Sequence, residues 1–333
     1  MSKVFLICGG AGYIGSHMVK QLTQSGHRVI ALDNLSTGFE KAARFADELV
    51  IADLADVDAV RDIFTKYTFD GVMHFAAASL VAESLSNPGK YYRNNLSYTL
   101  NLLDVMIENN VNHFVFSSTA AVFGEPQYIP IDEIHPKNPI NPYGASKLMV
   151  ERVLQDYAST HKLNSVSLRY FNACGADPEG ELGEMHDPET HLIPLILQAG
   201  SGRRENIDIY GSDYPTSDGT CIRDYIHVSD LCDAHWLAIS KLFSSELQGA
   251  NFLNLGNGDG FSVKQVIEKA KEVVSADGRQ IQIQEKSRRD GDPAILVADS
   301  TRAKELLGWE PKFCDLEDMI SHAWSWEKSL NQK

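Results

Sequence analysis

The stretch KVFLICGGAGYIG, residues 3–15, joins a short apolar run to glycines at positions 9, 12 and 15. A helical pattern, HMVKQLTQSG, follows at 17–26. A strand, a glycine-rich turn and a helix in this order open a doubly wound parallel sheet. Gly9, Gly12 and Gly15 allow a tight turn and close approach of the backbone to a pyrophosphate, which the positive end of the helix attracts. The stretch therefore predicts an α/β fold that binds a dinucleotide.

Further apolar strands extend this pattern through the first half of the chain. We expect them at 28–33, 48–53, 69–76, 113–118 and 165–171, with helical segments such as 95–109 and 142–160 between them. Apolar strands that alternate with helices predict a parallel sheet covered on both faces. We expect a Rossmann-type domain over residues 1–172 and a smaller mixed α/β domain over 173–333. A return of part of 222–250 to the first domain stays open.

An acidic residue ends the second predicted strand. Asp33 lies 18 residues past Gly15, where a carboxylate binds both hydroxyls of the adenosine ribose. It would repel a 2′-phosphate, and neither Arg nor Lys follows at 34–36, so the pattern favours NAD over NADP. Asp53 and Leu54 follow the third strand and are expected to flank the adenine, although an acid at a strand end is also common as a helix cap. Tyr13, Ile14 and Asn34 complete the expected cofactor contacts in these two motifs.

The segment NPYGASKL, 141–148, places a phenol and an ammonium one helical turn apart. We expect Asn141 as the N-cap and Pro142 in the first turn of a helix. Tyr143 and Lys147 then share one helix face, where the ammonium favours the phenolate form of the tyrosine. Ser118 and Thr119 are expected just past the end of the strand near 113–118, on the ligand-binding side of the sheet, where a hydroxyl can share a substrate proton with Tyr143. We predict Tyr143, Lys147 and Thr119 as catalytic residues.

Composition narrows the class of function. The formal net charge is −15, which repels phosphate backbones and argues against nucleic acid as a partner. No apolar run approaches the roughly 20 residues that span a bilayer, and the start of the chain lacks the features of a signal peptide. The five cysteines are scattered, without a C-x-x-C pair, which suits a reducing cytoplasm and gives no support to zinc or disulfides. We therefore expect no metal and no membrane contact.

Several longer motifs carry a resemblance to a known family. They include GGAGYIGSH (9–17), PGKYYRNN (88–95), FSSTAAVFG (116–124), RYFNACGA (169–176), DYPTSDGTCIRDYIHV (213–228) and RRDGD (288–292). Together they resemble the extended short-chain dehydrogenases/reductases and, within these, the UDP-glucose 4-epimerases, over nearly the whole chain. The resemblance implies an isomerase of galactose and nucleotide-sugar metabolism that interconverts UDP-glucose and UDP-galactose. It also implies that NAD stays tightly bound and is not consumed.

The resemblance also implies roles for single residues. Tyr143 would take the proton of the sugar 4-hydroxyl while the C4 hydride passes to NAD, and the 4-keto sugar would rotate before the hydride returns. Thr119 stands where closely related members carry a serine. The expected NAD-site residues are Phe75, Ala76, Ala77, Asn94, Phe171, Tyr143 and Lys147. The expected substrate contacts are Thr119, Asn172 at the sugar nucleotide, Leu192 and Tyr210 at the uracil, Arg223 and Arg289 at the diphosphate, and Asp292 at a ribose hydroxyl.

Leu296 matches a position that controls substrate size in the resembled family. A tyrosine there restricts members to unacetylated sugars and a small residue admits N-acetyl sugars. The intermediate leucine predicts UDP-glucose and UDP-galactose as the main pair, with some turnover of UDP-N-acetylglucosamine. An epimerase of N-acetylated sugars or of UDP-pentoses remains an alternative.

Other classes of function fit less well. A nucleotide-sugar dehydratase usually carries an acidic pair after the threonine, where this chain has Ala120 and Ala121. A non-catalytic dinucleotide sensor would not need Tyr143 and Lys147 together, and an alcohol dehydrogenase would consume free NAD. By analogy with the family we expect a homodimer through the helices near 95–109 and 142–160. The pathway, either galactose use or precursor supply for polysaccharides, stays open.

Overall fold

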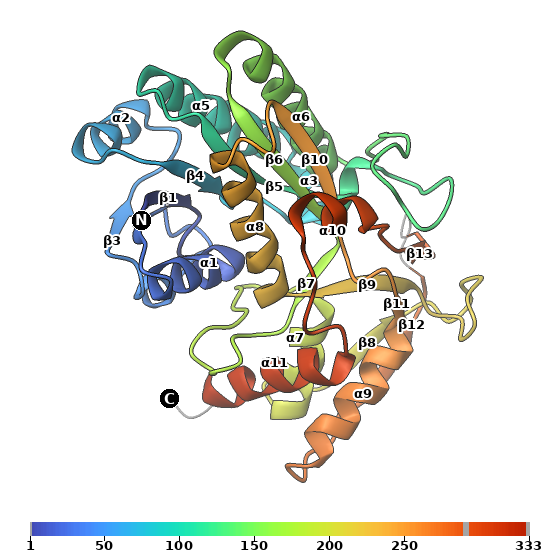
Figure 1. Cartoon of the computed structure of the whole chain (residues 1–333). Coiled ribbons are helices and arrows are strands. Elements are labelled where there is room, and N and C mark those ends of the chain that lie inside the picture. Colours follow the sequence, from blue (N-terminus) through green and yellow to red (C-terminus); the bar gives the residue numbers. More distant parts are fainter. Residues whose placement is uncertain (1, 289–292, 331–333) are drawn as a thin grey trace.

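A seven-stranded parallel sheet forms the upper part of the molecule (Figure 1). The computed structural model describes residues 2–288 and 293–330. The strand order is β10-β6-β5-β4-β1-β2-β3, and every neighbouring pair runs parallel. Its strands are β1 (Val4–Cys8), β2 (Arg28–Asp33), β3 (Glu48–Ile51), β4 (Gly71–His74), β5 (His113–Thr119), β6 (Asn164–Tyr170) and β10 (Ala250–Leu255). The order reverses between β1 and β4, and ligands of such sheets bind at the carboxyl ends of strands beside that point.

The six predicted strands are confirmed, and the Rossmann-type fold with them. β10 was not expected from the sequence, because Asn251 and Asn254 interrupt its apolar run. The chain returns to the sheet with helix α8 (Val228–Phe243) and then with β10. Residues 222–227, which were candidates for this return, instead form β9 in a second sheet. The return therefore begins at Val228, and the boundary near 172 stays a prediction.

Helices cover both faces of the main sheet. The alternation of a buried strand sends Phe5 and Ile7 to one face, where they pack with α1 (Tyr13–Gln24), α8 and α10 (Thr301–Leu307). Leu6 and Cys8 point to the other face, against α2 (Val57–Lys66), α5 (Tyr98–Glu108) and α6 (Pro142–His161). The short connecting elements are η1 (Glu40–Ala43), α3 (Val81–Ser86), α4 (Pro88–Tyr91), the π-helix η2 (Tyr92–Ser97) and the 3₁₀ turn η3 (Ala120–Val122).

Smaller sheets and three helices form the lower part of the molecule (Figure 1). β7 (Asn172–Cys174), β9 (Ile222–His227), β11 (Gly260–Ser262) and β13 (Ile295–Leu296) make a four-stranded sheet around β9. β8 (Ile207–Tyr210) pairs with β12 (Ile283–Lys286). α7 (Leu192–Ser201), α9 (Val263–Ser275) and α11 (Leu316–Leu330) share one apolar core. This part is mixed α/β, as the sequence predicts.

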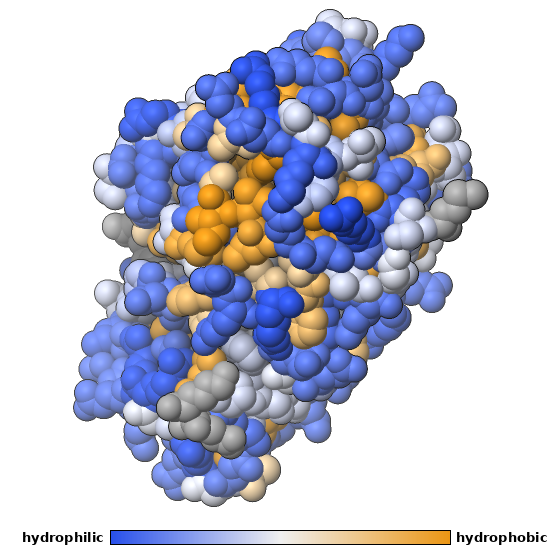
Figure 2. Space-filling view, turned by 90° about the vertical axis from the view of Figure 1, so that its left-hand side faces the viewer, coloured by the Kyte–Doolittle hydropathy of each residue, from blue (hydrophilic) through white to orange (hydrophobic). Residues whose placement is uncertain are grey.

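The face shown in Figure 2 is mostly hydrophilic, with one apolar area near its centre. Within the described residues, no helix combines the length and the apolar composition needed to cross a bilayer. None of the five cysteines forms a disulfide within the part of the chain that the structure describes, and four of them are buried.

A buried carboxylate fastens the chain beyond α10 to helix α8. Asp230 accepts hydrogen bonds from the backbone N–H groups of Lys312 and Phe313 at 2.8 and 2.9 Å. Its own backbone carbonyl accepts one from the indole of the fully buried Trp309 at 2.9 Å. These contacts hold the segment that leads from the main sheet to α11.

Replacing Asp230 with alanine removes the acceptor of two shielded N–H groups. We expect Asp230→Ala to lower the free energy of unfolding by about 1–3 kcal/mol, measured by urea unfolding. The control is Asp233→Asn on the same helix, which weakens a partly exposed ion pair with Lys312 and should cost less than about 1 kcal/mol. Equal losses in the two variants would contradict the role given to Asp230.

Candidate active site

The glycine turn is packed too closely for any other residue at two positions. A Cβ atom on Gly9 would lie 2.6 Å from the backbone nitrogen of Ala76, and one on Gly15 would lie 2.0 Å from the Gly9 carbonyl oxygen. Gly9 also has a φ of +81°, which L side chains rarely adopt. Gly12 is the N-cap of α1 and no side chain caps that helix end. The backbone N–H groups of its first turn therefore suit a diphosphate.

The acidic residue that ends β2 is held by backbone N–H groups of the glycine turn and of the segment that follows β2. Asp33 is 7% exposed and accepts hydrogen bonds from the N–H groups of Ala11 and Leu35, both at 2.9 Å. Burial raises the pKa of its carboxyl, and the two hydrogen bonds oppose that rise. Asn34 donates to the Asp53 carboxylate at 2.7 Å, which joins the ends of β2 and β3. Leu54 is buried beside them.

The predicted contacts after β1 and β4 meet at the switch point of the sheet. Phe75 and Ala76 both donate their backbone N–H to the Cys8 carbonyl, at 2.8 and 3.1 Å, and Ala77 follows them. Ile14 and Phe75 pack against the same apolar core. The hydroxyl of Tyr13 donates to the Gly175 carbonyl at 2.7 Å, so this side chain ties the glycine turn to the segment after β7.

Helix α6 begins as the sequence predicts and presses against the turn that follows β5. Asn141 caps it by accepting the N–H of Gly144 at 2.8 Å, with Pro142 in the first turn. A Cβ on Gly144 would lie 2.4 Å from the Ala121 carbonyl oxygen, so only glycine permits this approach. The approach brings Tyr143 to Thr119, the last residue of β5, and their side chains interact.

The environment of Tyr143 and Lys147 shifts both pKa values. Burial raises the pKa of Tyr143, and the interaction with Thr119 lowers it. Lys147 is 3% exposed and donates to the Ser117 carbonyl at 2.7 Å. Burial lowers the pKa of Lys147 to about 7, although Glu151 one turn further along α6 opposes this. The lysine charge therefore responds to any anion or cation that arrives beside it.

A buried ion pair behind these residues was missed by the sequence analysis. Arg169 in β6 donates twice to Glu151, at 2.8 and 2.6 Å, and all three partners of the network are nearly inaccessible. Ser118, the third partner, donates to Glu151 at 2.6 Å. Ser118 therefore serves this network, and Thr119 is the hydroxyl that meets Tyr143. An arginine within a predicted strand of a sheet covered on both faces was the signal that something pairs with it.

The π-helical turn η2 carries Asn94 and its neighbour Asn95. Asn94 donates to the side chain of Asn95 at 3.0 Å. Asn95 is buried and bonds to Ala78 in both directions and to Ser146 of α6. π-Helical turns are frequent at functional sites. Asn95, which the sequence analysis did not single out, thus fixes the segment after β4 against α6.

The predicted substrate residues come from several elements of the lower part. Asn172 opens β7, Leu192 opens α7 and Tyr210 ends β8. Leu296 of β13 lies beside Arg223 of β9 in the strand register. Arg289 and Asp292 lie outside the described residues.

Leu296 also connects the predicted substrate residues to helix α6. Leu296 and Phe171 pack on one small apolar cluster of Val122, Phe123 and Ile131, together with Ala120 and Leu148. Leu148 directly follows Lys147 in α6. Leu296 and Phe171 are thus brought to the turn after β5.

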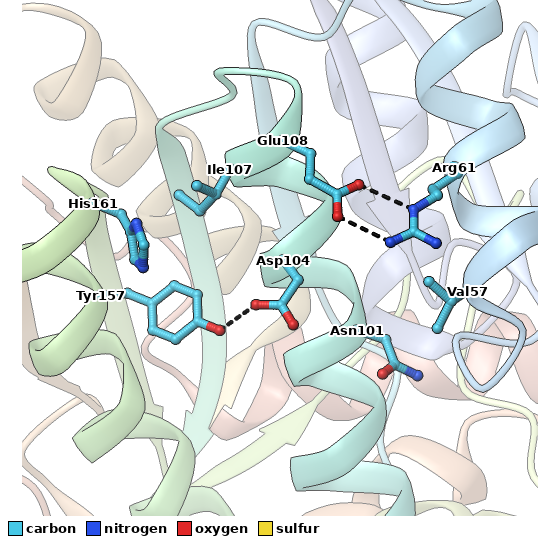
Figure 3. A pocket seen from close by; sticks show the side chains of 8 residues that line it. All are labelled: Val57, Arg61, Asn101, Asp104, Ile107, Glu108, Tyr157 and His161. Carbon is cyan, nitrogen blue, oxygen red and sulfur yellow. Dashed lines mark hydrogen bonds and ion pairs between the residues drawn. The ribbon is translucent and has the colours of Figure 1, made fainter.

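A separate surface pocket lies between α2, α5 and α6 (Figure 3). Its volume is about 310 Å³, and paired polar side chains line it: Arg61 with Glu108, and Tyr157 with Asp104. None of the predicted site residues lines it. It is therefore distinct from the candidate active site.

Comparison with known proteins identifies the family of this chain. Residues 5–255 match the model of the NAD dependent epimerase/dehydratase family. The chain belongs to this family. It is 50% identical to a UDP-glucose 4-epimerase of Halalkalibacterium halodurans, over 97% of this chain and 95% of that protein. The family assignment thus confirms the resemblance seen in the motifs.

Solved structures of the same family share the fold over almost the whole chain. A crystal structure of a UDP-glucose 4-epimerase matches with a TM-score of 0.95 at 48% identity and covers 98% of both chains. The UDP-glucose 4-epimerase of Brucella ovis, solved in complex with NAD, matches with a TM-score of 0.93 at 44% identity. That match covers 97% of this chain and 98% of the other.

The lowered pKa of Lys147 predicts a pH-dependent stability. The unfolded chain keeps the lysine proton up to about pH 10.5, whereas the folded chain without cofactor releases it near pH 7. Because the unfolded state binds more protons between these values, stability rises with pH there, by at most about 1.4 kcal/mol per unit. Urea unfolding at pH 7, 8 and 9 should show the wild type gaining stability relative to Lys147→Met. Parallel pH curves for the two proteins would contradict the burial argument.

Proposed function

We propose that the chain is an NAD-dependent isomerase that interconverts UDP-glucose and UDP-galactose at C4. The observation that carries this proposal is the meeting of Tyr143, Thr119 and Lys147 at the carboxyl end of β5, on the same edge of the parallel sheet as the glycine turn after β1. The relatives named UDP-glucose 4-epimerase, at up to 50% identity over nearly the full length, support the substrate.

The residues of the glycine turn fit a bound NAD. The uncapped start of α1 offers N–H groups to the diphosphate, and the close packing of Gly9 and Gly15 leaves the backbone itself as the contact surface. Asp33 keeps lone pairs for the ribose hydroxyls after accepting two N–H bonds. We assign the cofactor contacts to this turn together with Asn34, Asp53, Leu54, Phe75, Ala76, Ala77, Asn94 and Phe171. NAD would supply a hydride acceptor that is restored in each turnover.

We assign the transfer of the sugar 4-hydroxyl proton to Tyr143. In its phenolate form, Tyr143 would take the proton of the sugar 4-hydroxyl and later return it, while the Thr119 hydroxyl would hydrogen-bond to that sugar oxygen. The raised pKa of Tyr143 keeps it a phenol in the free chain. A cation beside the ring would lower that pKa, and Lys147, one turn away, is the positioned source of charge.

The substrate contacts are assigned to the residues of the lower part. Asn172 would hold the sugar nucleotide, Arg223 the diphosphate, and Leu192 with Tyr210 the uracil. An arginine fork suits phosphate oxygens because it donates two parallel hydrogen bonds. Arg289 and Asp292 are proposed from their motif alone.

Replacing Tyr143 with phenylalanine tests the proposed epimerase activity and the role of the Tyr143 hydroxyl. Purified protein without added NAD should convert UDP-galactose to UDP-glucose, and Tyr143→Phe should slow this roughly 10²- to 10⁴-fold because the proton acceptor is lost. Chromatography of the two nucleotide sugars measures the conversion. Tyr128→Phe, an exposed tyrosine that bonds to Asp132, serves as control and should keep full activity. Equal activity of the wild type and Tyr143→Phe would refute the assignment.

Leu296 tests substrate size. We expect detectable turnover of UDP-N-acetylglucosamine by the wild type at high enzyme concentration. Leu296→Tyr should reduce that turnover relative to UDP-glucose, because the ring would fill space beside Phe171 on the shared apolar cluster. The ratio of kcat/KM for the two sugars is the readout, and a ratio that the substitution leaves unchanged would show that Leu296 has no part in specificity.

We also propose a cytoplasmic homodimer formed through α5 and α6. Two features of this surface support a contact there: the half-exposed Met149 on α6 and the surface pocket between α2, α5 and α6 (Figure 3). Light scattering should give about twice the chain mass of 36.9 kDa. Met149→Asp should shift the mass toward that of one chain, and a single-chain mass for the wild type would rule the dimer out.

A further inference from the structure

Two glutamates and two histidines gather in the segment that leads from β7 to α7. The sequence EMHDPETH, 184–191, supplies Glu184, His186, Glu189 and His191. One ligand atom from each lies within 4.8 Å of the other three. None of these residues has a part in the function proposed above.

Two distances from His186 are those of the edges of a coordination tetrahedron. His186 Nδ1 lies 3.3 Å from Glu184 Oε1 and 3.5 Å from a carboxylate oxygen of Glu189. His191 Nδ1 lies 4.0 Å from the other carboxylate oxygen of Glu189 and forms a direct hydrogen bond with Glu184 Oε1. Ligands about 2.0–2.2 Å from a tetrahedral ion stand roughly 3.3–3.6 Å apart. The two His186 distances therefore fit such a site, and an ion would take the place of the direct hydrogen bond between His191 and Glu184.

Burial makes a cation at this point favourable. The side chains of Glu184 and Glu189 are each 5% exposed, so two carboxylates share a shielded site. His186 Nδ1 is buried and forms no hydrogen bond with any residue that the structure describes. His191 is exposed and leaves a route for an ion to reach the site. Buried carboxylates of like charge need positive charge beside them, which either protonated histidines or a bound cation can supply.

We propose that Glu184, His186, Glu189 and His191 form a four-ligand site for a divalent transition-metal ion, zinc above all. Imidazole nitrogen combined with carboxylate suits zinc, whereas Mg²⁺ and Ca²⁺ take oxygen ligands. Four protein ligands leave no open position, which is typical of a structural zinc site. The expectation of no metal rested on the cysteines alone and did not weigh this motif.

The position of the site shows what an ion would hold together. His191 is the N-cap of α7, directly before Leu192. The Glu184 carbonyl accepts the indole N–H of Trp326 in α11 at 3.0 Å. The ring of His186 lies 6.4 Å from that of Tyr13 in the glycine turn. The ion would thus fasten the start of α7 between α11 and the glycine turn.

The test is zinc binding by the full chain, without a histidine tag and without substrate. The protein is stripped with a chelator and then dialysed against buffered zinc, and the metal is measured by atomic emission. We expect about one zinc per chain and a melting temperature that rises with zinc and falls again with chelator. The variants Glu184→Gln and His186→Gln should lose the stoichiometric zinc.

Matched controls come from the same chain. Glu179→Gln alters a second carboxylate group, whose members Asp177, Glu179 and Glu181 already surround the Lys20 ammonium at 2.7–2.8 Å. His161→Gln removes an exposed histidine. Both controls should keep the zinc and the shift in melting temperature.

Three results would overturn the proposal. They are zinc below one half per wild-type chain, zinc retained by the double variant Glu184→Gln/His186→Gln, or a wild-type melting temperature that neither zinc nor chelator changes. The last result would leave the cluster as glutamate–histidine ion pairs. The wild-type titration decides the question if a variant does not fold. Since no sugar nucleotide is used, the outcome is independent of the proposed activity.

Discussion

The contact between the first turn of α6 and the turn after β5 is the constraint on which the candidate site depends. The Gly144 backbone approaches the Ala121 carbonyl so closely that any Cβ would force the two elements apart. β5 fixes Thr119, and α6 carries Tyr143 and Lys147 on one face. Three side chains from two elements are therefore placed by a single backbone approach, which the Asn141 cap holds in position.

Buried charged side chains on α6 and β6 lie behind this contact, and they neutralise one another. Lys147 is buried, and its nearest partners are a backbone carbonyl and, one turn away, the Glu151 carboxylate. Glu151 is itself neutralised by Arg169 and also accepts from Ser118. A buried ion pair is costly to break because one charge would remain unpaired. The pair thus supports the sheet under the site without supplying a reacting group, and it leaves the lysine charge free to respond to a bound ligand.

Much of this arrangement could be predicted from the sequence, where signals are local. The strand at 28–33, the Asn141 cap and the glycine turn each follow from short patterns of apolar, capping and small residues. Contacts between distant segments could not be predicted. β10 reaches the sheet through an interrupted apolar run, and Arg169 meets Glu151 only because β6 packs under α6. The glutamate–histidine cluster was overlooked because metal binding was sought among cysteines.

The most direct test of this account is the kcat of Gly144→Ala for the conversion of UDP-galactose to UDP-glucose. The added Cβ should displace the first turn of α6, which carries Tyr143, by a fraction of an ångström to 1 Å. We expect this displacement to lower kcat roughly 10²-fold in a chain that still folds, as judged by circular dichroism. Gly89→Ala, where a Cβ would meet only the flexible end of Arg93, should leave kcat nearly unchanged. An unchanged kcat in Gly144→Ala would contradict the claim that this contact positions Tyr143.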